Sequence, residues 1–161
     1  MKETGYRLNV GLIVANQEGK LLLCKRKNTK SWQFPQGGIN DNEDPLKAAK
    51  RELFEEVGIN PKSVHLIKCC DEWLKYEVPF NKRRRKILDR KFKGQKQKWF
   101  LFKLVKDTKI SFDNDPDQEF DDFKWVSYWY PVKKIISFKE NVYRIALNEL
   151  KYSFCKEFNN V

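Results

Sequence analysis

The stretch GGINDNEDPLKAAKRELFEEVGI, residues 37–59, decides the fold of this chain. It predicts a helix that begins after Asp44, whose carboxylate accepts hydrogen bonds from the free N–H groups of a helix start, and Pro45 suits the first helical position. Gly58 favours the left-handed conformation that ends a helix. Apolar side chains recur at helical spacing and predict a buried stripe that consists of Leu46, Ala49, Leu53 and Val57.

Three glutamates, Glu52, Glu55 and Glu56, share one face of this predicted helix because their spacing is i, i+3 and i+4. Like charges at this spacing repel each other by roughly a few tenths of a kcal/mol per pair. They also lie near the C-terminal end of the helix, where the helix dipole disfavours negative charge. Two explanations are open at this point: a solvated acidic face, or a binding site for a divalent cation that prefers oxygen ligands.

The spacing of the residues around the glutamates is more specific than the glutamates alone. The order Gly–x5–Glu–x7–Arg-Glu-Leu–x–Glu-Glu–x–Gly-Ile runs from Gly37 to Ile59. Even without the apolar Leu53 and Ile59, the seven other residues at roughly 1 in 15 each give about one chance match per 10⁸ windows. This pattern is the Nudix box, and the chain therefore resembles the Nudix hydrolase family.

The resemblance implies an α+β fold, a mixed β-sheet in an α/β/α sandwich, formed by a single domain over residues 1–161. Nudix hydrolases cleave a pyrophosphate bond in a nucleoside diphosphate that is linked to another group. One to four divalent cations, Mg²⁺ or Mn²⁺, bridge the phosphates and the box. By this resemblance the metal ligands are Glu52, Glu55, Glu56 and the carbonyl of Gly37. Glu52 or Glu56 takes the proton from the attacking water, and Glu52 is the preferred candidate.

The other fixed residues of the box are expected to have structural roles. Glu43 and Arg51 pair to hold the preceding loop against the helix, and Gly58 ends the helix. Glu119, which lies outside the box, is a further candidate metal ligand or base, because Nudix enzymes often take such a residue from a loop before the last strand. The alternative for Glu119 is a solvated acidic loop over residues 113–122, which hold six Asp and Glu and no Lys or Arg.

Strand and helix patterns flank the box on both sides. The predicted strands span 7–15, 20–26, 63–70, 72–78, 98–105 and 123–128, and 31–39 is predicted to be a loop or a short strand. A short helix is predicted to begin at Tyr130-Pro131. A C-terminal helix is predicted over 139–154, with Val142, Ile145, Ala146 and Leu150 on one side. The tryptophans that lie in or near strands are expected in the core; they are Trp32, Trp99, Trp125 and Trp129.

The net charge of +11 is distributed unevenly along the chain. Residues 82–98 contain ten basic residues and one acidic residue, so this segment supplies +9 of the total. Such a segment attracts polyphosphates of any kind, and its length fits a polymer whose phosphates extend beyond the scissile end. The alternative is a solvated loop that keeps the protein soluble.

Segments outside the box resemble one group within the family, the bacterial RNA pyrophosphohydrolases and diadenosine polyphosphate hydrolases. They are GYRLNVGLIV (5–14), SWQFPQGGI (31–39), GQKQKWFLF (94–102), EFDDFKWVSYWYPV (119–132) and ISFKENVYR (136–144). The resemblance implies removal of pyrophosphate from the 5′ triphosphate end of RNA, which leaves a 5′ monophosphate and promotes mRNA decay. The alternative is hydrolysis of diadenosine tetra- or pentaphosphate. A mononucleotide hydrolase, a non-catalytic RNA-binding module and a factor that acts mainly through protein partners are less favoured.

Candidate substrate-binding residues follow from the same resemblance. Single-stranded RNA is held by bases that stack on aromatic rings and Arg planes, and the candidates for stacking are Arg26, Tyr76 and Phe138. In the resembling enzymes, positions that match Arg26, Phe138 and Lys139 hold the first bases, and positions that match Arg7 and Gln95 lie near the phosphates.

The sequence predicts a cytoplasmic protein without membrane or DNA partners, and a monomer is favoured. Residues 1–9 contain no apolar run, and no stretch approaches 18 apolar residues. The four cysteines have neither metal-ligand nor disulfide-framework spacing. His65, the only histidine, is predicted on a strand surface, which argues against a His-dependent nucleophile or a zinc site.

Overall fold

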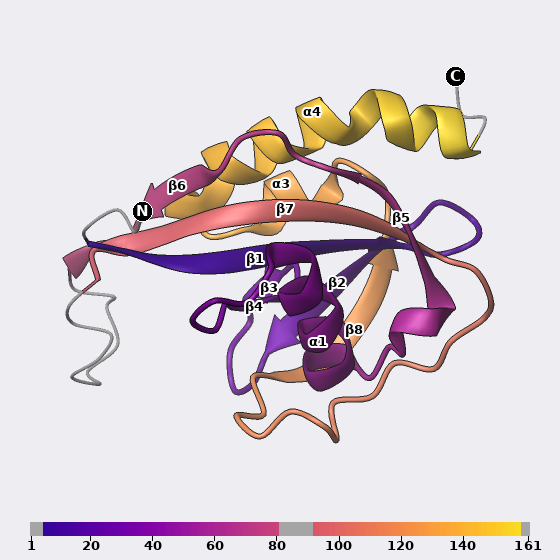
Figure 1. Ribbon diagram of the computed structural model, residues 1–161, viewed down its shortest axis with the longest axis horizontal. Coiled ribbons are helices and arrows are strands. Elements are labelled where there is room, and N and C mark those ends of the chain that lie inside the picture. Colours follow the sequence, from indigo (N-terminus) through magenta and orange to yellow (C-terminus); the bar gives the residue numbers. More distant parts are fainter. Residues whose placement is uncertain (1–4, 81–91, 159–161) are drawn as a thin grey trace.

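The computed structural model describes residues 5–80 and 92–158, in which groups of strands come before and after the first helix and two further helices lie towards the C-terminus (Figure 1). The strands are β1 (Tyr6–Ala15), β2 (Leu21–Arg26), β3 (Trp32–Gln33), β4 (Gln36–Gly38), β5 (Val64–Cys69), β6 (Leu74–Glu77), β7 (Gly94–Leu104) and β8 (Phe120–Val126). The helices are α1 (Pro45–Val57), α3 (Tyr130–Lys134) and α4 (Glu140–Phe158), with short 3-10 helices η1 (Pro61–Ser63) and η3 (Ser137–Lys139). None of the helices in this described part is long and apolar enough to cross a membrane.

The described strands form one eight-stranded mixed sheet. Its main path runs β3-β2-β1-β7-β5, while β4 pairs with β1, β6 with β7 and β8 with β2. β1 and β7 are parallel and the other pairs are antiparallel. Helix α1 covers one face, and α3 and α4 cover the other (Figure 1). The α+β sandwich predicted from the sequence is confirmed.

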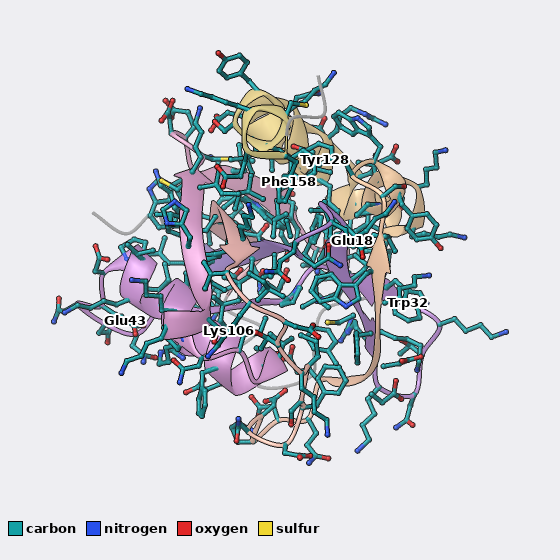
Figure 2. All side chains as sticks on the ribbon, turned by 90° about the vertical axis from the view of Figure 1, so that its right-hand side faces the viewer. Glu18, Trp32, Glu43, Lys106, Tyr128 and Phe158 are labelled. Carbon is teal, nitrogen blue, oxygen red and sulfur yellow. The ribbon has the colours of Figure 1, made fainter. Side chains whose placement is uncertain are left out.

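Each face of the sheet has its own hydrophobic core because successive side chains of a strand point to opposite faces. On β1, Ile13 packs in the cluster below α4, whereas Leu12 and Val14 pack in the cluster against α1. Figure 2 shows the same division, with Glu43 on the α1 side and Tyr128 and Phe158 near α4.

The long parallel ladder between β1 and β7 determines where the site forms. Its register runs from Tyr6 opposite Gly94 to Ala15 opposite Lys103. Close contact between these strands requires Gly11, because an added Cβ would lie 2.4 Å from the Trp99 ring. The register brings the polar first halves of both strands together at one end of the sheet.

Helix α1 has the bounds that the sequence predicts. The Asp44 carboxylate accepts hydrogen bonds from Leu46 N at 3.0 Å and Lys47 N at 3.3 Å. Gly58 has φ of 71° and its N–H donates back into the last turn. Both ends of the helix are set by capping contacts within the segment itself, which explains the agreement.

The following details differ from the expectations. β7 begins at Gly94 rather than Lys98, and β8 begins at Phe120 rather than Phe123, because polar residues that pair within the sheet lack the apolar pattern of a strand. Ile145 is 42% exposed, so its predicted place in the α4 stripe is wrong; the stripe contains the predicted Val142, Ala146 and Leu150 together with Tyr143, Leu147 and Phe154. Trp129 is 37% exposed, so its predicted core position is wrong.

Candidate active site

A cleft of about 620 Å³ lies where β1, β4, β6 and β7 meet the end of α1 and the loop before β8. Most of the predicted site residues line it: Arg7, Arg26, Gly37, Arg51, Glu52, Glu56, Tyr76, Gln95, Glu119, Phe138 and Lys139. Glu43, Glu55 and Gly58 are not among its lining residues. The fold therefore gathers residues from most of the length of the chain around one space.

Glu52 and Glu56 face inward from adjacent turns of α1. Their exposed fractions are 7% and 6%, so both carboxylates are buried. β4 passes close to them, and a Cβ added at Gly37 would lie 2.0 Å from Glu52 Cδ. Only glycine leaves room for the Glu52 carboxylate at this point, which explains its place in the pattern.

Ionisation of both buried carboxylates would place more negative charge in the cleft than nearby cations balance. Burial raises the pKa of Glu52 to about 7, an effect that the neighbouring Arg51 opposes. Burial, with repulsion from Glu119 and Asp115, raises the pKa of Glu56 to about 10. Among the described residues, Glu56 Oε2 has no hydrogen-bond partner. A divalent cation would relieve this imbalance, and carboxylate oxygens are the ligands that Mg²⁺ prefers.

The Arg51 side chain donates hydrogen bonds to several residues of the Nudix box. Its Nε donates to Glu43 Oε2 at 2.9 Å and its Nη2 to Glu43 Oε1 at 2.9 Å, which confirms the predicted pair. Nη2 also donates to the Gly38 carbonyl at 2.8 Å, so the same side chain holds β4 against α1. The Arg51 hydrogen bonds lower the pKa of Glu43.

Arg51 also determines how the glutamates of α1 are arranged. Its Nη1 donates to Glu52 Oε1 at 2.8 Å and to Glu55 Oε2 at 3.1 Å. Within residues 5–80 and 92–158, no three Asp, Glu, His or Cys side chains are gathered around a single point that suits a metal ion. Glu55, with its side chain 38% exposed, is engaged with Arg51 rather than turned towards Glu56.

The acidic loop before β8 is folded around a buried carboxylate. Asp115 is 4% exposed, and its two oxygens accept hydrogen bonds from Asp117 N and Glu119 N, each at 2.9 Å. The Glu119 carbonyl accepts a hydrogen bond from Lys27 N at 2.7 Å. These bonds place Glu119 at the cleft, so this loop is not simply solvated.

Tyr76 is buried and does not offer a free ring face for a base. Its exposed fraction is 6%, its ring centroid lies 5.9 Å from that of Phe138, and Lys139 Nζ lies 5.3 Å from its ring. Its hydroxyl donates to Gln95 Oε1 at 2.5 Å. We therefore replace the stacking role predicted for Tyr76 with one that acts through Gln95.

Several polar residues at the cleft were not predicted. Asn9, Gln33 and Gln36 line it, and Gln97 is buried behind it. The available signal was the presence of Asn and Gln within strands that are otherwise buried, since buried amides need hydrogen-bond partners. Asp117, in the acidic loop, also lines the cleft.

Most of the predicted basic segment, residues 82–91, lies outside the described residues. Of its remaining part, Lys96 and Lys98 belong to β7. Lys98 Nζ donates to the Asp71 carbonyl at 2.9 Å and lies over the Trp73 ring at 5.9 Å.

The fold and the box together identify the class of protein. The family model of the NUDIX domain matches residues 5–145, which is most of the chain. The chain therefore belongs to the Nudix family.

Similar sequences within this family are named RNA pyrophosphohydrolase. The RNA pyrophosphohydrolase of Pasteurella multocida is 48% identical over 150 residues, which cover 90% of this chain and 73% of the relative. That of Cellvibrio japonicus is 46% identical over 158 residues, covering 97% of this chain and 92% of the relative.

Solved structures support the fold at lower identity. Escherichia coli dihydroneopterin triphosphate pyrophosphohydrolase superposes with a TM-score of 0.69 at 21% identity, covering 89% of this chain and 98% of the other. The Caenorhabditis elegans Ap4A hydrolase gives 0.66 at 21% identity, covering 96% and 99%. Likeness at this identity concerns the fold alone.

Proposed function

We propose that this protein is an RNA pyrophosphohydrolase, which removes pyrophosphate from the 5′ triphosphate end of RNA and leaves a 5′ monophosphate. One observation carries the proposal: a single cleft joins the buried box carboxylates to a second end with cationic, amide and aromatic side chains. The acidic end suits metal-bound phosphates, and the other end suits a nucleotide. Relatives named RNA pyrophosphohydrolase at 46% and 48% identity support this substrate.

The acidic end suits one or more divalent cations, Mg²⁺ or Mn²⁺. Glu52, Glu56 and the Gly37 carbonyl would hold them, with Glu119 from the loop before β8. Glu55 joins this set only if it leaves Arg51, which now binds it. A bound cation would neutralise phosphate charge and lower the pKa of a coordinated water.

The chain's own groups complete the chemistry. Glu52, a carboxylate at the acidic end of the cleft, accepts the proton of the water that attacks phosphorus. The bond between phosphorus and the bridging oxygen breaks, and pyrophosphate leaves. Arg7 and Gln95 bind phosphate oxygens, while Arg26, Phe138 and Lys139 hold the first bases.

The test is a competition assay in Mg²⁺ that offers 5′-triphosphorylated RNA and diadenosine pentaphosphate together. The variant Glu56→Gln provides the blank. Faster hydrolysis of the RNA by the wild-type protein is the expected result. A preference for the dinucleotide would make the protein a dinucleoside polyphosphate hydrolase and would overturn the proposal. Action as a monomer in the cytoplasm stays a prediction from the sequence.

A further inference from the structure

A chain of hydrogen bonds runs along the floor of the cleft from a buried asparagine to its open side. Gln97 Nε2 donates to Asn9 Oδ1 at 2.8 Å and to Gln36 Oε1 at 3.1 Å. Gln36 Nε2 donates to Gln95 Oε1 at 3.1 Å. Lys139 Nζ approaches Gln36 Oε1 at 3.5 Å. Gln36 is thus the point where the amide chain meets both Gln95 and Lys139.

Lys139 determines the direction of the chain. An ammonium group has three donors and no acceptor, so the atom of Gln36 that faces Lys139 must be the oxygen. The amide nitrogen of Gln36 then faces Gln95, whose oxygen must accept. Tyr76 donates its hydroxyl hydrogen to the same oxygen, in agreement with this direction. The NH₂ group of Gln95 is consequently the donor that this side chain presents to a ligand in the cleft.

The inner part of the chain is rigid because the sheet places it and water does not reach it. Asn9 is 3% exposed and Gln97 is 1% exposed. They lie opposite each other in the β1–β7 ladder, and Gln36 lies opposite Gly11 in the β1–β4 pairing. Breaking one bond would leave a buried amide unsatisfied, which costs about 1–3 kcal/mol.

We propose that Gln36 is a positioning residue that holds Gln95 with its NH₂ group towards the substrate phosphates. This inference rests on the proposed function, in that Gln95 is taken to bind phosphate. The amide nitrogen of Gln36 donates to Gln95 Oε1 and its oxygen accepts from Gln97 and Lys139, so Gln95 is the contact through which Gln36 reaches the phosphate-binding end. Its contribution is to binding, since the described contacts of Gln36 do not include the carboxylates of α1.

A double-mutant cycle tests this role. Gln36→Met keeps the length of the side chain but removes both amide groups, and Gln95→Ala removes the group that is positioned. We expect each single variant to raise KM about tenfold, the loss of one hydrogen bond to a charged group, with kcat within about twofold of wild type. The double variant should show a KM within about twofold of Gln95→Ala, because Gln36 has nothing left to position.

Controls separate positioning from a general loss of structure. Gln17→Met alters an exposed glutamine whose side-chain bond is a 3.4 Å contact with the Val105 carbonyl, and it should leave KM unchanged. Gln36→Asn keeps an uncharged amide but is one methylene too short to reach Gln95 in the same way; it serves in the same cycle if Gln36→Met lowers the melting temperature strongly. A KM about a hundredfold above wild type in the double variant would mean that the two substitutions act independently and would overturn the inference. A fall in kcat with an unchanged KM in Gln36→Met would overturn it as well.

The cycle is independent of the substrate proposed above. Both 5′-triphosphorylated RNA and diadenosine pentaphosphate carry phosphates, so the cycle is measured on whichever of them the wild-type protein hydrolyses. A wild-type preference for the dinucleotide would overturn the proposed function alone. An additive cycle on the preferred substrate would overturn the role of Gln36 alone.

Discussion

Glu56 combines a buried carboxylate with neighbours of the same charge, so its ionisation opposes folding in the absence of metal. Its pKa of about 10 in the folded protein lies above the usual 4.5, so the unfolded chain loses this proton at lower pH than the folded one. The free energy of unfolding therefore decreases as pH rises from about 4.5 towards 10. A cation bound at this carboxylate would reverse the effect.

We predict that the melting temperature of the metal-free protein falls between pH 5 and pH 9, and that Mg²⁺ raises it more at pH 8 than at pH 6. Glu56→Gln should flatten the pH dependence, weaken the response to Mg²⁺ and reduce kcat by more than about a hundredfold. Glu72→Gln, at an exposed position, is the matched control. An unchanged pH slope in Glu56→Gln would contradict the assignment.

Substitution of Arg51 by lysine tests whether the Nudix box needs a guanidinium group or only a positive charge. Lysine cannot make the forked bonds to Glu43 and the Gly38 carbonyl together with a bond to Glu52. Arg51→Lys should lower the free energy of unfolding by about 2 kcal/mol and also reduce activity, since the β4–α1 contact loosens. Denaturant unfolding measures the first effect.

The control for Arg51 is Arg144, which makes one exposed pair with Glu140 at 2.8 Å. Arg144→Lys should change stability by less than about 0.5 kcal/mol, because exposed ion pairs contribute little. Equal losses of stability in Arg51→Lys and Arg144→Lys would show that the hydrogen bonds of Arg51 contribute no more than one exposed ion pair.

Among the elements, the contact between β4 and α1 places the acidic end of the cleft. β4 crosses so close to Glu52 that an added Cβ at Gly37 would overlap its side chain, whereas at Gly38 the nearest atom is the flexible end of Arg7 at 3.0 Å. The two adjacent glycines therefore give a matched pair of substitutions.

We predict that Gly37→Ala displaces Glu52 and reduces kcat by at least about a hundredfold, and lowers stability by about 1–3 kcal/mol through overpacking. Gly38→Ala should retain most of kcat, because Arg7 can move. Activity assays with a thermal melt of each variant measure both effects. Full activity in Gly37→Ala would show that the close approach has no catalytic role.

For the whole molecule, the distribution of charge bears on which substrate is used. A polymer with phosphates beyond the scissile end releases several counterions when it binds, and a dinucleotide releases fewer. We predict that KM for 5′-triphosphorylated RNA rises steeply with salt, and that neutralising Arg83, Arg84 and Arg85 lowers the slope of log KM against log salt by about 2. The same substitutions should leave the KM for diadenosine pentaphosphate almost unchanged. If the wild-type protein and the variant gave equal slopes with RNA, these arginines would not bind RNA and would serve solubility instead.

Local chemistry explains the features that were predicted from the sequence. These features are the bounds of α1, its caps and the Glu43–Arg51 pair. They depend on contacts between residues that are near in the sequence, so the sequence is enough to predict them. The Nudix box has the same character, since its spacing is a property of one loop and one helix. The reaction class follows from that short segment.

Tertiary structure alone brought together the other half of the cleft. Arg7, Gln36, Gln95 and Lys139 are far apart in the chain, and strand pairing with the packing of η3 over β6 makes them neighbours. The structure also shows that Tyr76 is buried and bonded to Gln95, so it is not a stacking residue. Ile145 is exposed and lies outside the α4 stripe. Register and burial are set by the balance of many distant contacts, whereas caps, periodicity and motif spacing are local; this is why the chemistry could be inferred from the sequence and the geometry of substrate binding could not.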